Sequence, residues 1–241
     1  MKKILFLLLI SFAIQSPGIA GFDKKPKKIL VFTKTKGFYH KSIPAGVKAL
    51  LAMGVEKGIV VDTTSDATRF VYKELKGYDA IVFLSTTGNM LDDEQQAAFK
   101  RYINKGGGFV GIHAAADAEY DWSWYNQLVG GYFLSHPQQQ QATLVVQDAT
   151  HISTQHLPQQ WKRYDEWYNY KSIQTDLHVL LTLDETSYTG GKNGSFHPIA
   201  WYHDFDGGRA FYTGLGHTDE SFVEPLFLQH IWGGIVYAMN G

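Results

Sequence analysis

The sequence has no cysteine among its 241 residues. This absence excludes disulfide bridges, thiolate metal ligands and thiol nucleophiles. Secreted domains often depend on disulfides, but a chain of this length can bury enough apolar surface to be stable without them. With 44% hydrophobic residues, the composition predicts one globular domain with a sizeable core.

An excess of positive charge is also absent, since the formal net charge is −1 at pH 7. Nucleic-acid-binding domains usually carry a basic patch or stripe. The one basic cluster here, Lys24 to Lys28, is typical of a solvated linker. The charge balance therefore argues against a nucleic-acid partner, while the composition leaves a homo-oligomer open.

Long hydrophobic runs are missing apart from Ile4–Ile14, which is too short to span a bilayer. Two lysines precede this run, and Gly18 and Ala20 are small residues of the kind found at a signal-peptide cleavage site. We therefore predict a signal peptide over residues 1–20, cleavage near Ala20 and a linker over residues 21–27. The mature protein is expected to be periplasmic or secreted, with no membrane anchor after cleavage.

The first half of the mature chain alternates short apolar runs with helical patterns. The predicted strands cover residues 28–33, 58–62, 79–84 and 108–112, and the predicted helices cover residues 43–53, 70–75 and 92–105. Asp92 and Gln95 form a capping box at the start of the third helix, and Gly106 can end it. Strands that are apolar on both faces and alternate with helices predict an α/β fold with a doubly wound, mostly parallel sheet.

Beyond Asp117 the pattern changes, but it contains no internal repeat. We predict a short helix over residues 122–129, strands over 142–147 and 179–183, a hairpin of 198–203 with 209–213, and a closing helix over 222–239. A single domain over residues 28–241 accounts for all of these elements.

Several polar residues follow the predicted strands directly. In an open parallel sheet, ligands collect at the carboxyl ends of the strands. His40, His113 and His217 lie at such positions, while Thr87 follows the third strand and His136 lies in a later loop. Imidazole serves both for proton transfer near neutral pH and for metal ligation. The three strand-end histidines are therefore candidate ligands of a divalent metal such as zinc, assembled across loops, although each has an ordinary structural alternative.

A second group of candidates combines acids with aromatic rings. Asp165, Glu166 and Trp167 are consecutive, and Asp117 and Trp122 follow the His113 turn. Carboxylates can hold sugar hydroxyls while aromatic rings stack on the sugar. The acids could equally orient a histidine, and helix packing or an ordinary loop with buried aromatics explains the same residues.

An ordered set of short motifs resembles a known family. The set consists of GGGFVGIHAAAD at residues 106–117, the Asp121-Trp122 pair, SHP at 135–137, DEWY at 165–168, HPIAW at 197–201 and GLGH at 214–217. Together these motifs resemble the ThuA-like, or trehalose-utilisation, domain of the class I glutamine amidotransferase-like superfamily. The resemblance covers the chain from about Lys28 to the C-terminus and implies a flavodoxin-like sheet with helices on both faces.

The resemblance gives His113 an unusual position. Amidotransferases of that fold carry their cysteine nucleophile at the turn that His113 occupies here. Their triad histidine resembles His217, with Asp219 standing where a glutamate is usual. Glutamine hydrolysis by a thiolate is excluded because the chain has no cysteine. The resemblance implies a scaffold that has lost the nucleophile, with histidine chemistry in its place.

The functional hypotheses follow from these observations. The first is an exported enzyme, either a hydrolase, a lyase or an isomerase, that acts on a disaccharide or keto-sugar by histidine acid–base or metal-assisted chemistry. Its catalytic candidates are His113, His217, Asp165 and Glu166. The alternative is a non-catalytic carbohydrate-binding protein on the same fold, and a third hypothesis is a scaffold protein with a vestigial pocket. Fold alone does not decide among them.

Overall fold

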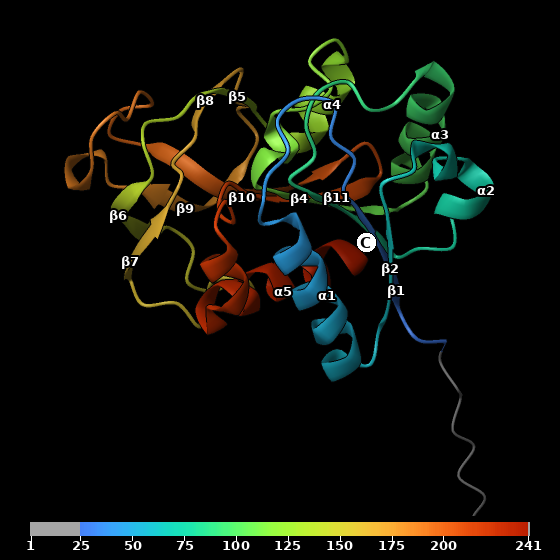
Figure 1. Ribbon diagram of the computed structural model, residues 1–241, viewed down its shortest axis with the longest axis horizontal. Helices are drawn as coiled ribbons and strands as arrows, with labels where there is room; N and C mark the ends of the chain where they lie inside the picture. Colours follow the sequence, from blue (N-terminus) through green and yellow to red (C-terminus); the bar gives the residue numbers. More distant parts are fainter. Residues whose placement is uncertain (1–24, 241) are drawn as a thin grey trace, which may run out of the picture.

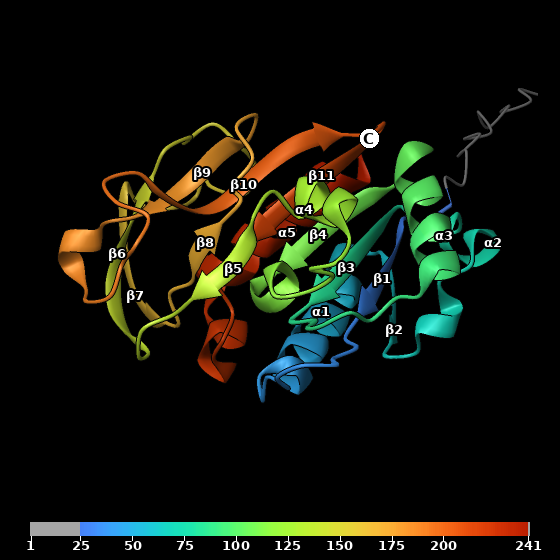
Figure 2. The ribbon, with the colours of Figure 1, turned by 90° about the horizontal axis from the view of Figure 1, so that it is seen from above.

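The computed structural model describes residues 25–240 as an α/β domain built on one nine-stranded sheet. The sheet order is β2-β1-β3-β4-β11-β10-β9-β6-β7. Its parallel part consists of β1 (Lys28–Phe32), β2 (Val60–Thr64), β3 (Ala80–Leu84), β4 (Gly108–Ile112) and β11 (Gly208–Thr213). Figure 2 shows the sheet with β2 at one edge and β7 at the other.

Antiparallel strands extend the sheet beyond β11. They are β10 (His197–Phe205), β9 (His178–Leu183), β6 (Gln140–Val146) and β7 (Gln160–Asp165). A separate two-stranded sheet pairs β5 (Tyr132–Ser135) with β8 (Asn169–Lys171). The flavodoxin-like arrangement is thus formed by the first half of the chain together with β11 and α5. The segment between these two parts adds antiparallel strands that bring residues 165–171 back toward the parallel strands.

Helices cover both faces of the sheet (Figure 1). One face carries α1 (Ile43–Lys57) and α5 (Pro225–Met239), and the other carries α2 (Tyr72–Leu75), α3 (Asp93–Asn104) and α4 (Ser123–Val129). Every residue of β3 and β4 is buried between these layers. This double coverage explains why both strands read as continuous apolar runs in the sequence.

Local sequence signals account for several boundaries. The capping box of Asp92 with Gln95 is present at the start of α3. At Gly108 a side chain would be impossible, because an added Cβ would lie 2.3 Å from the carbonyl oxygen of Ala238. The glycine therefore lets α5 pack directly against the start of β4.

The predicted elements are reproduced most closely in the parallel part. Three strands have no counterpart in the prediction, namely β5, β7 and β8. The closing helix begins at Pro225 rather than Phe222, because residues Asp219–Val223 form a 3₁₀ turn capped by Thr218. The predicted signal peptide over residues 1–20, and the linker up to residue 24, lie outside the described residues. Within residues 25–240, no helix has both the length and the apolar character that crossing a bilayer requires.

Candidate functional site

His113 occupies the sharp turn that follows β4 and begins a 3₁₀ turn over His113–Ala116. Its φ of 51° lies in the left-handed region, which a non-glycine residue rarely adopts. Contacts on two sides hold it there. The hydroxyl of Tyr212 donates to the carbonyl oxygen of His113, and Nδ1 of His113 lies 2.9 Å from the carbonyl oxygen of Gly214. Because a carbonyl can only accept, Nδ1 carries a hydrogen, and in the neutral form of the ring the lone pair is on Nε2.

Nε2 of His113 points at His217, in the loop that follows β11. The distance from Nε2 of His113 to Nδ1 of His217 is 3.1 Å. His113 is fully buried, whereas the side chain of His217 is 15% exposed. Solvent therefore reaches this pair from the side of His217.

His40 completes a triangle of imidazoles from the loop after β1. Its ring centroid lies 4.8 Å from that of His113 and 5.2 Å from that of His217. Its Nδ1 atom is buried and has no hydrogen-bond partner among the described residues. Burial, together with the two neighbouring rings, lowers the pKa of His40 to about 2. The ring is therefore neutral at ordinary pH, which is the form that binds metals.

Glu166 brings a carboxylate to the same point from the end of β7. Its Oε2 atom lies 3.1 Å from Nδ1 of His217 and 3.5 Å from Nε2 of His113, and its Oε1 atom lies 3.2 Å from Nδ1 of His136. Burial alone would raise the pKa of Glu166, but its contacts with His113 and His217 outweigh burial and hold the pKa below its usual range. Glu166 is therefore ionised and links the buried histidines to the partly exposed His136.

These four residues form what we call the His40–Glu166 cluster: His40, His113, Glu166 and His217. Each offers one ligand atom, and the four atoms all lie within 4.8 Å of one another. Ligands about 2.0–2.2 Å from a tetrahedral metal are spaced by roughly 3.4 Å, close to the 3.1 and 3.5 Å separations found here. Three imidazoles and one carboxylate are a donor set that zinc, iron, manganese and related divalent ions accept. The residues present thus fit a divalent metal.

Asp165 contributes indirectly. Its carboxylate is fully buried and accepts hydrogen bonds from the backbone N–H groups of Gly216 and His217, each at 3.0 Å. Nη2 of Arg163 lies 3.1 Å from the same carboxylate. Of the roles predicted for Asp165, the contacts match orientation of a histidine, because its oxygens fix the loop that carries His217 rather than facing solvent.

Thr87 also acts on a loop rather than on the cluster itself. Its hydroxyl donates to the carbonyl oxygen of Phe38 at 2.9 Å and accepts from the N–H of Gly37 at 3.2 Å. Thr87 is fully buried. Instead of presenting its hydroxyl to a substrate, it ties the loop that carries His40 to the end of β3.

The two tryptophans predicted to contact a sugar lie elsewhere. Trp167 is fully buried, and its indole N–H donates to the carbonyl oxygen of Gln140. Trp122 stacks on Trp124 at 4.8 Å and is partly buried against the core. Helix and sheet packing, the alternative explanation, therefore accounts for both rings.

Asp117 and His136 lie closer to the cluster. Asp117 accepts a hydrogen bond from the hydroxyl of Tyr120 at 2.6 Å, and burial raises the pKa of this carboxyl. The side chain of His136 is 43% exposed. Asp117 is partly exposed and His136 is exposed, so solvent reaches both side chains beside the cluster.

Two aromatic residues beside the cluster have no counterpart in the prediction. The ring of Tyr168 lies 4.4 Å from that of His113 and stacks over His136 at 6.1 Å. The ring of Phe38 lies 4.9 Å from that of His40. Tyr168 belongs to the DEWY motif, so its proximity to Glu166 in sequence was the available signal. For Phe38, the signal was its place two residues before His40.

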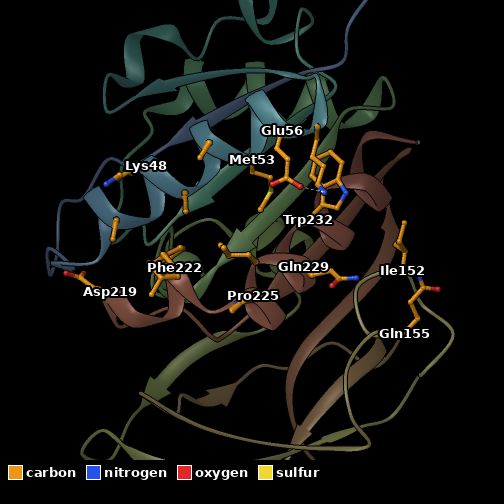
Figure 3. Close-up of a pocket in the computed structure, with 16 residues that line it drawn as sticks. Lys48, Met53, Glu56, Ile152, Gln155, Asp219, Phe222, Pro225, Gln229 and Trp232 are labelled. Carbon is orange, nitrogen blue, oxygen red and sulfur yellow. Dashed lines mark hydrogen bonds and ion pairs between the residues drawn. The ribbon is translucent and has the colours of Figure 1, made fainter.

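An apolar groove of about 1050 Å³ lies between α1 and α5, on the face opposite α3 and α4. Met53 of α1 and Trp232 of α5 both line it (Figure 3). Asp219, whose position resembles that of a triad acid, is exposed and lines this groove. The carboxylate that contacts His217 is instead Glu166, which corrects the expectation drawn from the resemblance.

The profile of the ThuA family, described as trehalose utilisation, matches residues 28–238. The chain belongs to the ThuA family. No protein with a curated description matches it.

Solved structures agree with this family membership. A ThuA-like protein from Bacteroides uniformis is 26% identical, with a TM-score of 0.77 over 91% of this chain and 94% of that one. A ThuA-like protein from Parabacteroides merdae is 22% identical, with a TM-score of 0.73 over 90% and 91%. A protein from Thermoplasma acidophilum described as part of a GMP synthase is 14% identical, with a TM-score of 0.56 over 90% and 96%. These similarities fit the class I glutamine amidotransferase-like superfamily, and those below 25% identity concern the fold alone.

Proposed function

We propose that this ThuA family member is an exported enzyme of carbohydrate utilisation that acts on a disaccharide or keto-sugar by metal-assisted acid–base chemistry. The observation that carries the proposal is the convergence of His40, His113, Glu166 and His217, from four loops, on one partly solvent-accessible point. The trehalose-utilisation description of the family supports a carbohydrate as substrate.

A divalent cation such as zinc would supply Lewis-acid polarisation and a bound water of lowered pKa. His40, His113, Glu166 and His217 would hold it, with the Nδ1–H of His113 fixed by the carbonyl of Gly214 so that Nε2 faces the cation. Such hydrogen bonds to the far nitrogen orient metal-binding histidines. The chain's own residues thus prepare the site before any substrate arrives.

His136 supplies the group that exchanges a proton with substrate. Its Nδ1 lies 2.9 Å from the carbonyl of Pro137 and 3.2 Å from Oε1 of Glu166. Both partners are acceptors, so Nδ1 is the protonated nitrogen of the neutral ring. Nε2 is then left as the base, on a ring that is 43% exposed. Asp117, near His113 and His136, would accept a hydrogen bond from a sugar hydroxyl at the carboxylate oxygen that Tyr120 leaves free.

Elemental analysis and substrate screening test this proposal together. The exported protein is purified without chelators, its metals are measured by plasma mass spectrometry, and it is incubated with a panel of disaccharides and their 3-keto forms. We expect about one divalent ion per chain and turnover of at least one sugar. His113→Asn and His217→Asn should each lose both properties, and asparagine tolerates the positive φ at residue 113.

The matched control is Asp219→Asn, because Asp219 is an exposed acid two residues from His217 that lines the groove instead of the cluster. It should retain metal and turnover. Unchanged metal content in both histidine variants would overturn the metal assignment. Sugar binding without any product would instead favour the non-catalytic carbohydrate-binding alternative.

A further inference from the structure

We propose that Phe38 is the residue that holds a sugar ring next to the His40–Glu166 cluster, by stacking against an apolar C–H face of that ring. The inference rests on the proposed function, since it names how the carbohydrate is bound at the same site. It replaces Trp122 and Trp167, which the fold uses for packing, as the stacking residue.

The ring of Phe38 is both exposed and in contact with the cluster. It is 64% exposed, although most phenylalanine rings in this chain lie in the core. Its centroid lies 4.9 Å from that of His40, with an interplanar angle of 81°. One side of the ring therefore packs on a candidate metal ligand, and the remainder faces solvent beside it. The exposed part of the ring is available for apolar contact with a molecule bound at the cluster.

The loop that carries Phe38 is built to hold this exposure. The hydroxyl of Thr87 accepts a hydrogen bond from the backbone N–H of Gly37 and donates one to the backbone carbonyl of Phe38. Lys36 donates its backbone N–H to the carbonyl of Thr87 at 2.8 Å. A Cβ at Gly37 would lie 3.3 Å from the Thr87 side chain, so the two loops are in close contact. The backbone that carries the ring is therefore held in place before ligand binding, which reduces the entropic cost of ordering this loop.

The chemistry of the surface defines the ligand. A phenyl ring offers dispersion contacts and weak C–H interactions but no hydrogen bond. It suits a pyranose whose hydroxyls are equatorial, because such a ring presents axial C–H groups on its face. Polar recognition would come from Asp117 and His136, which lie near His113 and Glu166. The predicted ligand is a neutral gluco-configured sugar, and an axial hydroxyl on the stacked face should weaken binding.

The neighbouring Tyr39 provides a matched control. It is 54% exposed, aromatic and on the same loop, but among the described residues its ring forms no aromatic contact with the cluster. Phe38→Ala, Phe38→Trp and Tyr39→Ala are prepared as full-length chains. The dissociation constant for trehalose and for 3-keto-trehalose is measured by calorimetry on each protein, and the metal content is measured in parallel.

We expect Phe38→Ala to weaken binding of at least one of these sugars about five- to tenfold. Phe38→Trp should retain affinity, and Tyr39→Ala should stay within twofold of the unsubstituted chain. This pattern supports the inference even where no sugar is turned over, in which case the enzymatic proposal alone fails. Equal affinities of Phe38→Ala and the unsubstituted chain would overturn it. The inference would also be overturned if Tyr39→Ala lost as much sugar affinity as Phe38→Ala, or if the unsubstituted chain bound no sugar.

Discussion

His113 and His217 are 104 residues apart in sequence, yet Nε2 of His113 lies 3.1 Å from Nδ1 of His217. Parallel pairing of β4 with β11 produces this proximity, because the two residues follow the carboxyl ends of neighbouring strands. The carboxylate of Glu166 reaches the same point from the antiparallel half of the sheet. Three electron-rich atoms at these distances require a proton or a cation between them, and the proposed metal would meet this requirement.

Removing the charge of Glu166 tests whether its carboxylate is a metal ligand. Glu166→Gln keeps the size of the side chain but removes the negative charge beside His113 and His217. We expect metal affinity to fall at least 10- to 100-fold. Losses of this size are already typical when the substituted residue only hydrogen-bonds to a metal ligand. Competition with a chromophoric chelator measures this affinity. An unchanged dissociation constant would contradict the role of the carboxylate as a ligand.

Asp165→Ala should destabilise the fold rather than merely alter the chemistry. The substitution removes the acceptor of the N–H groups of Gly216 and His217 and leaves Arg163 buried without that ion pair. Breaking a buried ion pair by removing one partner costs about 3–5 kcal/mol. Urea unfolding followed by tryptophan fluorescence should show this loss. A change below about 1 kcal/mol would mean that Glu224, at 3.4 Å from Arg163, compensates for Asp165.

The sequence allowed the parallel part of the fold to be predicted because its strands are short, apolar and separated by helices. Histidines at strand ends could be identified for the same reason. By contrast, β7 buries the charged residues Arg163 and Asp165 and exposes Tyr164, so its sequence does not alternate apolar with polar residues. The other missed strand, β8, has three residues. Neither gives a strong local signal.

Side-chain direction explains the remaining differences at the site. Asp165 and Glu166 are adjacent and chemically alike, but strand alternation sends one carboxylate to backbone N–H groups and the other to the histidines. Nothing in the composition distinguishes them. Trp167 has the residue type expected for stacking on a sugar, but its ring is fully buried and offers no surface to a ligand. The position of Phe38 depends on a contact between two loops that is made by the hydroxyl of Thr87. No hydrophobic periodicity in the sequence indicates such a contact.

Thr87→Val tests that loop–loop contact. Valine preserves the shape of threonine but leaves the N–H of Gly37 and the carbonyl of Phe38 without their shared partner. We expect a loss of about 1–3 kcal/mol in the free energy of unfolding. Amide hydrogen exchange should also become faster at residues 36–40. Unchanged exchange in this loop would show that backbone pairing alone holds it.

The stability of the fold should fall as the pH is lowered from 6.5 toward 4.5, with His230 as one cause. This ring is fully buried, and burial lowers its pKa to about 3 from an ordinary value of 6.5. Between these values the unfolded chain binds a proton that the folded chain cannot bind. The free energy of unfolding therefore decreases with falling pH, by about 1.4 kcal/mol per pH unit for one such group.

His230→Gln isolates this contribution, because glutamine does not titrate and its amide can still reach the carbonyl of Ser153, which Nδ1 of His230 contacts at 2.9 Å. Urea unfolding of both proteins at pH 7.5, 6.5, 5.5 and 4.5 gives the two slopes. We expect the variant to be less stable at pH 7.5 but to lose less stability per pH unit below 6.5. Its curve should therefore approach that of the unsubstituted protein as the pH falls. Parallel curves would mean that His230 takes up its proton equally in the folded and unfolded chains, which full burial in the core does not permit.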